Sequence, residues 1–304
     1  MMEGLRHCPD CGGTGSIWKE KVQVPCGYCG GKKYVGPIAE AAERIEVIGD
    51  ATLLQGDCLR ILPTLESVDH IICDPPYEQL MHDLHRSVKL RRLDGGKQRN
   101  ELGFAGIDAI REPFTREVKR LNRGWLLAFC NIEGVWFWRK ALLDQGLKFK
   151  TTCIWNKPDA TPKLNGQGPA LSYECFTTTW CGSGHARWNG GGRRGVFTHP
   201  TNNSERHGEH PTEKPVALMR ELVSLFSNLG QVVLDPFMGS GTTGVAAVKL
   251  GRRFIGVEID PAYFDIAVSR IREAHKQPDI FLEAERKATQ SDFLTDLINA
   301  GDAA

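Results

Sequence analysis

The sequence predicts an α/β protein with a mostly parallel β-sheet and flanking helices. Short apolar runs that are typical of buried strands alternate along the chain with segments of helical periodicity. Two apolar runs, at 70–73 and from Val232 onward, lead directly into motifs rich in proline or glycine. Open α/β sheets bind their ligands at the carboxyl ends of strands, so these two motifs mark the expected site.

The remaining elements follow from the same patterns. Further strands are expected at 45–48, 51–55, 124–130, 149–155, 171–180 and 253–258. Helices are expected at 58–65, 113–122, 135–145, 215–227, 244–250 and 261–273.

Length and composition limit the class of protein. The 304 residues are enough for one sizeable domain and a small appendage. The formal net charge is +1, so any nucleic-acid binding must depend on local basic patches. The sequence has neither a long apolar segment nor a hydrophobic signal core, and its ten cysteines suit a reducing compartment. We therefore expect a cytoplasmic protein that binds no membrane.

The chain is expected to contain three units. A small N-terminal unit spans 1–36, a main domain spans 37–278, and a tail spans 279–304. Residues 37–42 are interpreted as a short connector. Two stretches of the main domain, 78–108 and 156–209, lack clear periodicity and are interpreted as long functional segments.

The first motif, Asp74-Pro75-Pro76-Tyr77, follows the strand expected at 70–73. It offers a carboxylate, two rings that fix the backbone and cannot donate hydrogen bonds, and an aromatic face. Asp74 and a backbone carbonyl could accept both hydrogens of an exocyclic amine while Tyr77 stacks on the attached ring. Alone, the motif fits a strand that ends in a proline turn equally well.

The second motif, at 235–243, reads Asp-Pro-Phe-Met-Gly-Ser-Gly-Thr-Thr and lies between an expected strand and an expected helix. Glycines allow a ligand to approach the backbone closely, and the free N–H groups at a helix start favour an anionic group. Glu258 ends the next expected strand, about 20 residues after the glycines. An acidic group at that place would accept hydrogen bonds from ribose hydroxyls.

Together, the two motifs resemble those of the S-adenosylmethionine-dependent amino-methyltransferases of DNA. The stretch 74–77 is similar to the family's catalytic motif, and 235–243 is similar to its cofactor loop. The catalytic motif comes first, which resembles the permuted β group. The stretches 56–59 and 210–215 extend the resemblance over roughly residues 45–273. It implies a Rossmann-like sheet of the methyltransferase type, with 156–209 as a target-recognition insert.

The resemblance also implies a role for each matching residue. The catalytic residues would be Asp74, Pro75, Pro76 and Tyr77. The cofactor S-adenosylmethionine would be bound by Asp57, Cys58, Asp74, Lys214, Asp235, Phe237, Gly239, Ser240, Gly241, Thr242, Thr243 and Glu258. Asp57 would contact the adenine amine of the cofactor, and it could also cap the helix at 58–65. Lys214 would pair with the methionine carboxylate; the alternative is an ordinary surface lysine.

The N-terminal unit contains two Cys-x-x-Cys pairs, Cys8 with Cys11 and Cys26 with Cys29. Two such pairs across a short loop suit a tetrahedral, structural Zn²⁺ site. The unit resembles half of the zinc region of J-domain chaperones, but Lys33 stands where the last glycine of the second repeat would be. We therefore expect zinc binding without chaperone function, and a redox-active cysteine pair is the alternative.

Candidate DNA contacts lie in the two aperiodic segments. The stretch 86–99 has six Lys or Arg residues against one acid, which favours a mobile basic loop that contacts phosphates and orders on DNA. A second basic tip, at 190–195, is rich in glycine. The candidate DNA-binding residues are Arg86, Lys89, Arg91, Arg92, Arg187, Arg193 and Arg194. The alternative for both segments is a solvated surface loop.

The expected activity is site-specific methylation of the N6 amine of an adenine flipped out of duplex DNA. The resemblance favours adenine over the N4 amine of cytosine because the catalytic motif begins with Asp. The alternatives are an N4-cytosine enzyme, an RNA substrate, and a zinc-containing nucleic-acid-binding protein with an inactive methyltransferase fold. Double-stranded DNA is the expected partner, and the resemblance also allows a homodimer and a partner restriction endonuclease.

Overall fold

The computed structural model describes residues 6–7, 16–19, 22–25, 34–77, 106–164, 168–201 and 213–277. In the N-terminal unit, two antiparallel strand pairs are described. They are β1 (Arg6–His7) with β4 (Tyr34–Val35), and β2 (Ser16–Lys19) with β3 (Val22–Pro25). The predicted zinc ligands, the predicted basic loop as far as residue 105 and the predicted tail from residue 279 lie outside the described residues.

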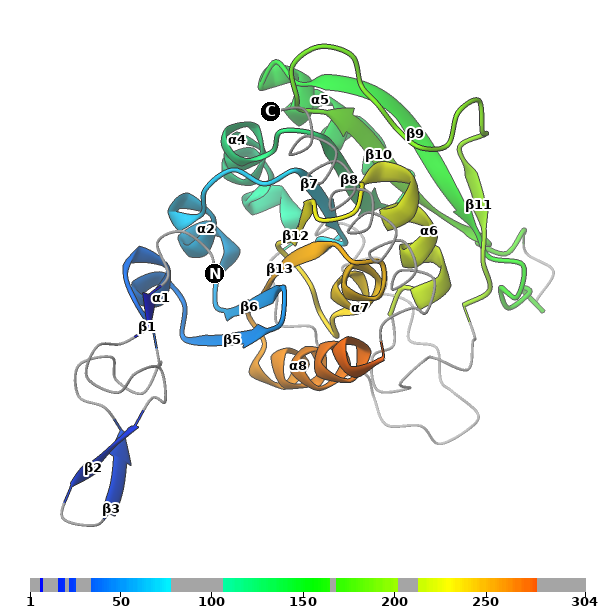
Figure 1. Ribbon diagram of the computed structural model, residues 1–304. Coiled ribbons are helices and arrows are strands. Elements are labelled where there is room, and N and C mark those ends of the chain that lie inside the picture. Colours follow the sequence, from blue (N-terminus) through cyan, green and yellow to red (C-terminus); the bar gives the residue numbers. More distant parts are fainter. Residues whose placement is uncertain are drawn as a thin grey trace, which may run out of the picture.

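A nine-stranded mixed sheet forms the centre of the described main domain (Figure 1). Across the sheet, the strands are β11 (Val196–Thr198), β9 (Lys148–Asn156), β10 (Tyr173–Trp180), β8 (Trp125–Cys130), β7 (His70–Cys73), β12 (Val232–Asp235), β13 (Arg253–Glu258), β6 (Ala51–Gln55) and β5 (Arg44–Ile48). From β8 to β6 the five strands are parallel, so their carboxyl ends meet at one edge. β5 and β10 are antiparallel to their neighbours. The predicted mostly parallel α/β sheet is confirmed.

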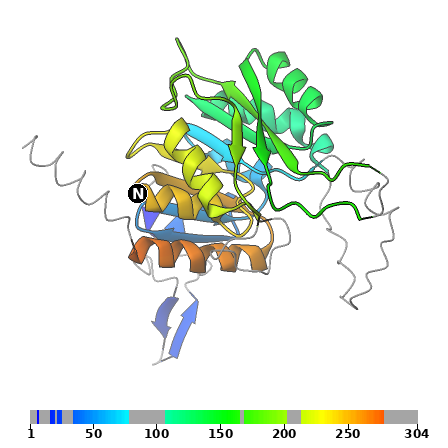
Figure 2. The same ribbon diagram turned by 90° about the vertical axis from the view of Figure 1, so that its right-hand side faces the viewer.

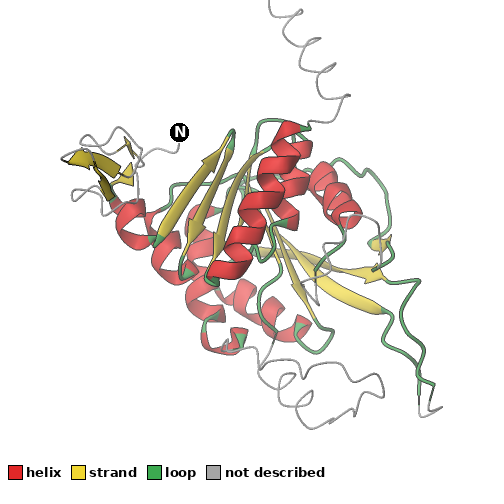
Figure 3. Cartoon of the chain, turned by 90° about the horizontal axis from the view of Figure 1, so that it is seen from below, coloured by secondary structure: helices red, strands yellow, loops and turns green. Residues whose placement is uncertain are grey.

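Helices cover both faces of this sheet (Figures 2 and 3). The first face is covered by α1 (Pro37–Ala41), α2 (Cys58–Ile61), α4 (Arg111–Leu121) and α5 (Val135–Asp144), with the short 3₁₀ helices η1 (Leu62–Thr64) and η2 (Ile107–Ala109). The second face is covered by α6 (Val216–Phe226), α7 (Thr242–Lys249) and α8 (Pro261–Lys276). None of the described helices is both long enough and apolar enough to cross a membrane.

Each face has its own apolar core because successive strand residues point to opposite sides. In β7, Ile71 packs into the core beneath α4 and α5, whereas Ile72 packs into the core beneath α6 and α7. Leu126 and Leu127 of β8 divide in the same way. The central strands are therefore apolar on both faces between their ends, which is why they are visible in the sequence as short apolar runs.

The predicted helices and strands of the main domain are confirmed, with ends that differ by a few residues. Two segments have another role in the fold than the one expected from the sequence. The predicted connector at 37–42 contains helix α1, which ends at Ala41, and Ile38 of this helix lies fully buried in the first core. The expected strand at 171–180 forms β10 inside the main sheet, between β8 and β9. Threonines fill much of β10, and two of their hydroxyls bond to neighbouring strands: Thr177 Oγ1 donates to Ala128 O at 3.4 Å and Thr178 Oγ1 to Thr151 O at 3.0 Å.

Gly244 of α7 provides a test of this packing. A Cβ at Gly244 would lie 2.4 Å from Ile271 Cδ1 of α8 and 2.6 Å from Phe254 Cε1 of β13. In an open helix, Gly→Ala stabilises by about 1 kcal/mol. At Gly244 the added methyl group would overpack the core, so the substitution should destabilise the protein. We expect Gly244→Ala to lower the free energy of unfolding by about 1–3 kcal/mol in urea titrations.

The matched control is Gly192→Ala, because a Cβ at Gly192 would meet nothing within 4 Å. Its stability should stay within about 0.5 kcal/mol of the wild type. A Gly244→Ala variant as stable as the wild type would contradict the close approach of α7, α8 and β13.

Candidate active site

Motifs that are far apart in the sequence meet at the carboxyl edge of the parallel strands. β7 leads into the stretch 74–77, and the neighbouring strand β12 ends at Asp235, where the glycine loop begins. β13 ends at Glu258, whose Cα partner is Gln55 at the end of β6. Asp57 follows two residues later. The topology therefore brings the predicted catalytic motif and cofactor residues to one edge of the sheet.

Lys214 lies between two carboxylates at this edge. Its Nζ is 2.5 Å from Asp74 Oδ2 and 3.1 Å from Glu174 Oε2. The ammonium also lies 5.1 Å from the ring centroid of Phe129 and 5.9 Å from that of Tyr77. Burial opposes the charge of Lys214, but the two carboxylates outweigh it and raise its pKa. The residue is only 6% exposed, which excludes the alternative of an ordinary surface lysine.

Asp74 keeps one carboxylate oxygen available. Its Oδ2 accepts the hydrogen bond from Lys214, whereas its Oδ1 is shielded from solvent and has no partner among the described residues. Burial raises the pKa of Asp74, and the charge of Lys214 opposes that rise. An unpaired buried acceptor is rare in folded proteins and is expected where a ligand supplies the donor.

Tyr77 and Glu174 complete the cluster. The Tyr77 hydroxyl donates to Glu174 Oε2 at 3.0 Å, and Lys157 pairs with Glu174 Oε1. Burial opposes ionisation of Glu174, yet Lys214 and Lys157 lower its pKa to about 2. Glu174 and Lys157 were not predicted from the sequence, because neither belongs to a local motif. Glu174 reaches this edge because β10 is antiparallel, so its beginning lies beside the ends of the parallel strands.

The start of the glycine loop is fixed by Asp235. Its Oδ1 accepts from the Phe237 backbone N–H at 3.0 Å, and its Oδ2 accepts from Thr243 Oγ1 at 2.6 Å. The bond from Thr243 joins the first and last residues of the motif. Asp235 is 2% exposed, and burial raises its pKa to about 7. Its observed contacts are structural ones that shape the loop.

Glu258 is held by backbone donors at the end of β13. Its Oε2 accepts from Gly239 N–H and its Oε1 from Asp260 N–H, both at 2.8 Å. Gly239 has a φ of 51°, a left-handed conformation that favours glycine. Each carboxylate oxygen keeps a further lone pair, which fits the ribose hydroxyls expected from the sequence.

An ion pair that was not predicted from the sequence supports the rest of the loop. Arg270 of α8 donates to Glu213 Oε1 at 2.5 Å and to both the carbonyl and the hydroxyl of Ser240 at 2.8 Å. Glu213 also accepts from Thr242 Oγ1 at 3.4 Å. The adjoining Gly241 has a φ of 84°, and a Cβ there would lie 2.9 Å from Ala267 Cβ. Gly241 is therefore required for the approach of α7 to α8.

Asp57 caps a helix, as its alternative interpretation predicts. Its Oδ1 accepts from the Leu59 backbone N–H at 2.9 Å and so begins α2. This bond leaves the second oxygen available for a ligand. The neighbouring Cys58 is buried, and burial raises the pKa of its thiol to about 12. Contacts of Asp57 and Cys58 with a cofactor remain predictions.

The predicted DNA-binding residues of the second segment are exposed. Arg187 and Arg194 lie on the surface. Arg193 pairs with Glu221 of α6 and lies 5.6 Å from the ring centroid of Phe197. Contact of any of these residues with DNA remains a prediction. The other four candidates, Arg86, Lys89, Arg91 and Arg92, lie outside the described residues, as do Cys8, Cys11, Cys26 and Cys29.

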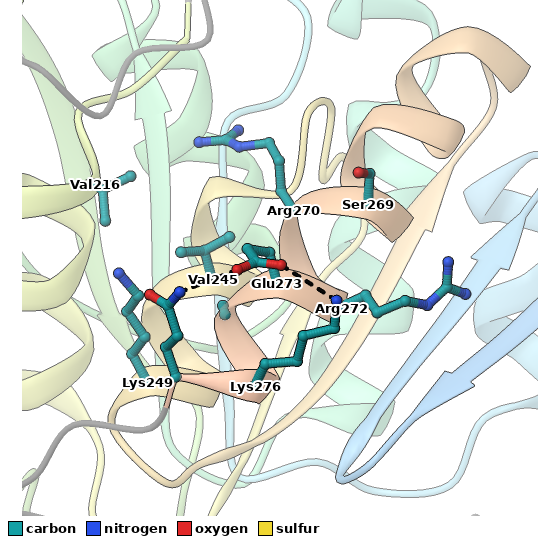
Figure 4. Close-up of a pocket in the computed structure, with 10 residues that line it drawn as sticks. Val216, Val245, Lys249, Ser269, Arg270, Arg272, Glu273 and Lys276 are labelled. Atoms are coloured by element: carbon teal, nitrogen blue, oxygen red, sulfur yellow. Dashed lines mark hydrogen bonds and ion pairs between the residues drawn. The ribbon is translucent and has the colours of Figure 1, made fainter.

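A surface hollow lies elsewhere, along α7 and α8 (Figure 4). Lys249, Arg272 and Lys276 surround Glu273 there, and Glu273 accepts from Lys276 and Gln277 at 3.4 and 3.0 Å. None of the strand-end residues lines this hollow. Its charges belong to an ordinary solvated face, and we assign it no role.

The raised pKa of Asp235 gives a pH dependence of stability. The folded protein holds the proton up to about pH 7, whereas a free Asp loses it near its ordinary pKa of 3.8. Stability is therefore lost as the pH rises between these values, by up to about 4 kcal/mol. Asp235→Asn keeps an acceptor for the Phe237 N–H but has no charge to bury.

We expect the unfolding free energy of Asp235→Asn to fall less than that of the wild type between about pH 4 and pH 7. Urea unfolding across this range measures the difference. Parallel curves for the two proteins would contradict the burial of an ionisable Asp235.

Comparisons with known proteins identify the family. The sequence model of the DNA methylase family (N6_N4_Mtase) matches residues 68–269. The type II methyltransferase M.HinfI of Haemophilus influenzae is 30% identical over 275 residues, which cover 75% of this chain and 70% of the relative. The type II methyltransferase M.Cfr9I of Citrobacter freundii is 28% identical over 272 residues, which cover 76% and 90%.

Solved structures agree with this result. The structure of the M1.HpyAVI–SAM complex matches with a TM-score of 0.57 at 26% identity, covering 73% of this chain and 98% of that one. The PvuII DNA methyltransferase (cytosine-N4-specific) matches with a TM-score of 0.57 at 16% identity, covering 76% and 93%, and shows a likeness of fold alone. The methyltransferase-type fold expected from the sequence is thus confirmed. By sequence and by fold, the chain belongs to the N6/N4 DNA methylase family and is a DNA methyltransferase.

Proposed function

We propose that this enzyme transfers the methyl group of S-adenosylmethionine to the N6 amine of an adenine flipped out of duplex DNA. The observation that carries this proposal is the unpaired, solvent-shielded Asp74 Oδ1, which follows β7 at the carboxyl edge of the sheet and lies in the same motif as Tyr77. Duplex DNA buries its exocyclic amines, so the target base must leave the stack to reach Asp74.

The residues at the strand ends fit S-adenosylmethionine, with which the similar M1.HpyAVI was crystallised. Glu258 would accept the ribose hydroxyls, and the free oxygen of Asp57 would accept from the adenine amine. Lys214 has three N–H donors, of which Asp74 and Glu174 use two. The third would bind the methionine carboxylate. When bound, the cofactor supplies an electrophilic methyl group on a positively charged sulfur.

The amine of the base is a poor nucleophile because its lone pair is delocalised into the ring. Asp74 Oδ1 and the Pro75 carbonyl would accept its two hydrogens, which directs the lone pair out of the plane of the ring. Tyr77 would stack on the base and hold this orientation. Much of the acceleration would come from this placement. As the C–N bond forms, positive charge develops on nitrogen, and Asp74 stabilises it until the proton leaves.

Adenine is proposed because the motif at 74–77 begins with Asp, on the resemblance described above. The N4 amine of cytosine needs the same two acceptors, so it is the main competing target. The decisive experiment supplies unmethylated bacterial DNA and S-adenosylmethionine with a labelled methyl group, followed by chromatography of the nucleosides. Label in N6-methyldeoxyadenosine is expected. Label in N4-methyldeoxycytidine would leave the mechanism in place but show that the target base is cytosine and not adenine. The absence of label in the DNA would contradict the proposal.

Asp74→Asn tests the role of the carboxylate. The amide is of similar shape but lacks the charge that stabilises the developing positive nitrogen. We expect the rate of methyl transfer to fall about 10²–10⁴-fold, the range for losing a positioned acceptor in the transition state. Affinity for S-adenosylmethionine, measured by calorimetry, should largely survive. Near-normal turnover would remove Asp74 from the mechanism.

Glu258→Gln tests cofactor binding, as Asp74→Asn tests catalysis. It should weaken S-adenosylmethionine binding about tenfold or more, the effect of losing hydrogen bonds to a charged acceptor. Unchanged affinity in calorimetry would contradict the proposed ribose contact.

We also propose that Cys8, Cys11, Cys26 and Cys29 hold a structural Zn²⁺ ion, on the grounds of their spacing. Within the described residues, no cluster of three or more His, Cys, Asp or Glu side chains could hold a metal ion. Metal analysis of the full-length protein should therefore find about one zinc per chain, and Cys26→Ser with Cys29→Ser should lose it. Metal-free protein purified without chelators would overturn this proposal.

A further inference from the structure

Glu174 stands at the junction of three charged or polar side chains. Its Oε2 accepts from the Tyr77 hydroxyl at 3.0 Å and lies 3.1 Å from Lys214 Nζ, while its Oε1 pairs with Lys157. The side chain is 18% exposed and belongs to the sheet strand β10. A carboxylate held by three donors on a rigid strand is a fixed point beside the catalytic motif.

We propose that Glu174 is a positioning residue for methyl transfer, which anchors Tyr77 through its hydroxyl and keeps Lys214 from occupying both oxygens of Asp74. The inference rests on the proposed function, because it takes Asp74 Oδ1 as the acceptor of the target amine. Glu174 itself need not touch the base or the cofactor.

The first part of the role concerns Lys214. Two carboxylates, Asp74 and Glu174, share its ammonium, and each receives one contact. Without the charge of Glu174, the ammonium would be drawn to Asp74 alone, where Oδ1 is the acceptor that remains open. Lys157 keeps Glu174 ionised. The positive charges of Lys157 and Lys214 therefore balance the negative charges of Glu174 and Asp74.

The second part concerns Tyr77. A ring that stacks on a flipped base must hold its plane before the base arrives, since any reorientation reduces the benefit of placement. The hydrogen bond to Glu174 supplies that restraint, because Glu174 is itself held by Lys157 and Lys214. The stacking contact needs only the ring, so the hydroxyl and the ring can be separated by mutation.

The charge of Glu174 also acts on the titration of Asp74. The ionisable groups that face Asp74 are Lys214, Glu174, Lys157, Asp235, Tyr77 and Cys73. Burial is the largest cause of the raised pKa of Asp74, and the negative charge of Glu174 adds to it. Removing that charge therefore lowers the pKa of Asp74. Protonation of Asp74, and the loss of activity it causes, then begins at a lower pH.

Two variants separate the two roles. Glu174→Gln keeps an oxygen that can accept from Tyr77 but removes the charge, whereas Tyr77→Phe keeps the ring and removes the hydroxyl. The methylated position is first located by sequencing DNA that the wild type has modified. Single-turnover rates of methyl transfer are then measured across the acidic pH range, with S-adenosylmethionine prebound and duplex DNA that carries this position. We expect each variant to lose about tenfold in rate, the effect of one hydrogen bond or ion contact to a charged group. Only Glu174→Gln should shift the acidic limb of the pH–rate profile, where protonation of Asp74 stops methyl transfer. The shift should be to lower pH.

Glu117→Gln is the matched control. Glu117 of α4 is 19% exposed and pairs with Arg120 at 2.7 Å, but it lies outside the active-site cluster. Its rate and acidic limb should equal those of the wild type. Melting curves of all variants establish that each one folds. If Glu174→Gln does not fold, Tyr77→Phe decides: a tenfold loss supports the anchoring role, and a wild-type rate overturns the proposal.

An unchanged rate and an unmoved acidic limb in folded Glu174→Gln would show that Glu174 is only a structural counter-ion. This failure is distinct from failure of the proposed function. If Asp74→Asn is inactive while Glu174→Gln matches the wild type, the positioning role alone is wrong. If Asp74→Asn keeps near-normal turnover, the proposed role of Asp74 is wrong; if the wild type transfers no label to DNA, the proposed function itself is wrong.

Discussion

The contact between Lys214 and Asp74 is the interaction on which the site depends. It joins Asp74, which directly follows β7, to Lys214, which lies just before the N-cap of α6, across 140 positions of the chain. A buried ammonium is stable only when carboxylates compensate its lost hydration, so Lys214 also requires Glu174. The same arrangement leaves one oxygen of Asp74 open. Charge balance and an available acceptor are thus two results of one geometry.

The sequence predicted those parts of the site that are local in the chain. The stretches 74–77 and 235–243 each combine a strand end with residues of unusual backbone chemistry, and such patterns do not depend on distant partners. Glu174 and Arg270 could not be predicted in this way. Their positions depend on β10 entering the sheet between β8 and β9 and on α8 packing against the glycine loop. The burial of α1 likewise depends on tertiary contacts, which a short proline-led segment does not reveal.

The glycine loop shows that folding and ligand binding can require the same residues. Gly241 admits Ala267 of α8 at close range, and Gly239 donates its backbone N–H to Glu258. The loop conformation is therefore fixed by the protein's own contacts before any ligand arrives. In a preorganised site, less binding energy is lost to ordering the loop when the ligand binds. This suits an enzyme whose rate depends on the placement of its substrates. The motif that resembles a cofactor loop is in this sense also a packing motif.

The measurement that tests the central claim most directly is a structure of the enzyme with duplex DNA and a non-reactive analogue of S-adenosylmethionine. We predict that the exocyclic nitrogen of the flipped base lies within hydrogen-bond distance of Asp74 Oδ1, about 2.7–3.2 Å, while Lys214 remains on Oδ2. An amine bound away from Asp74, or a Lys214 side chain that occupies both oxygens in the complex, would contradict the account.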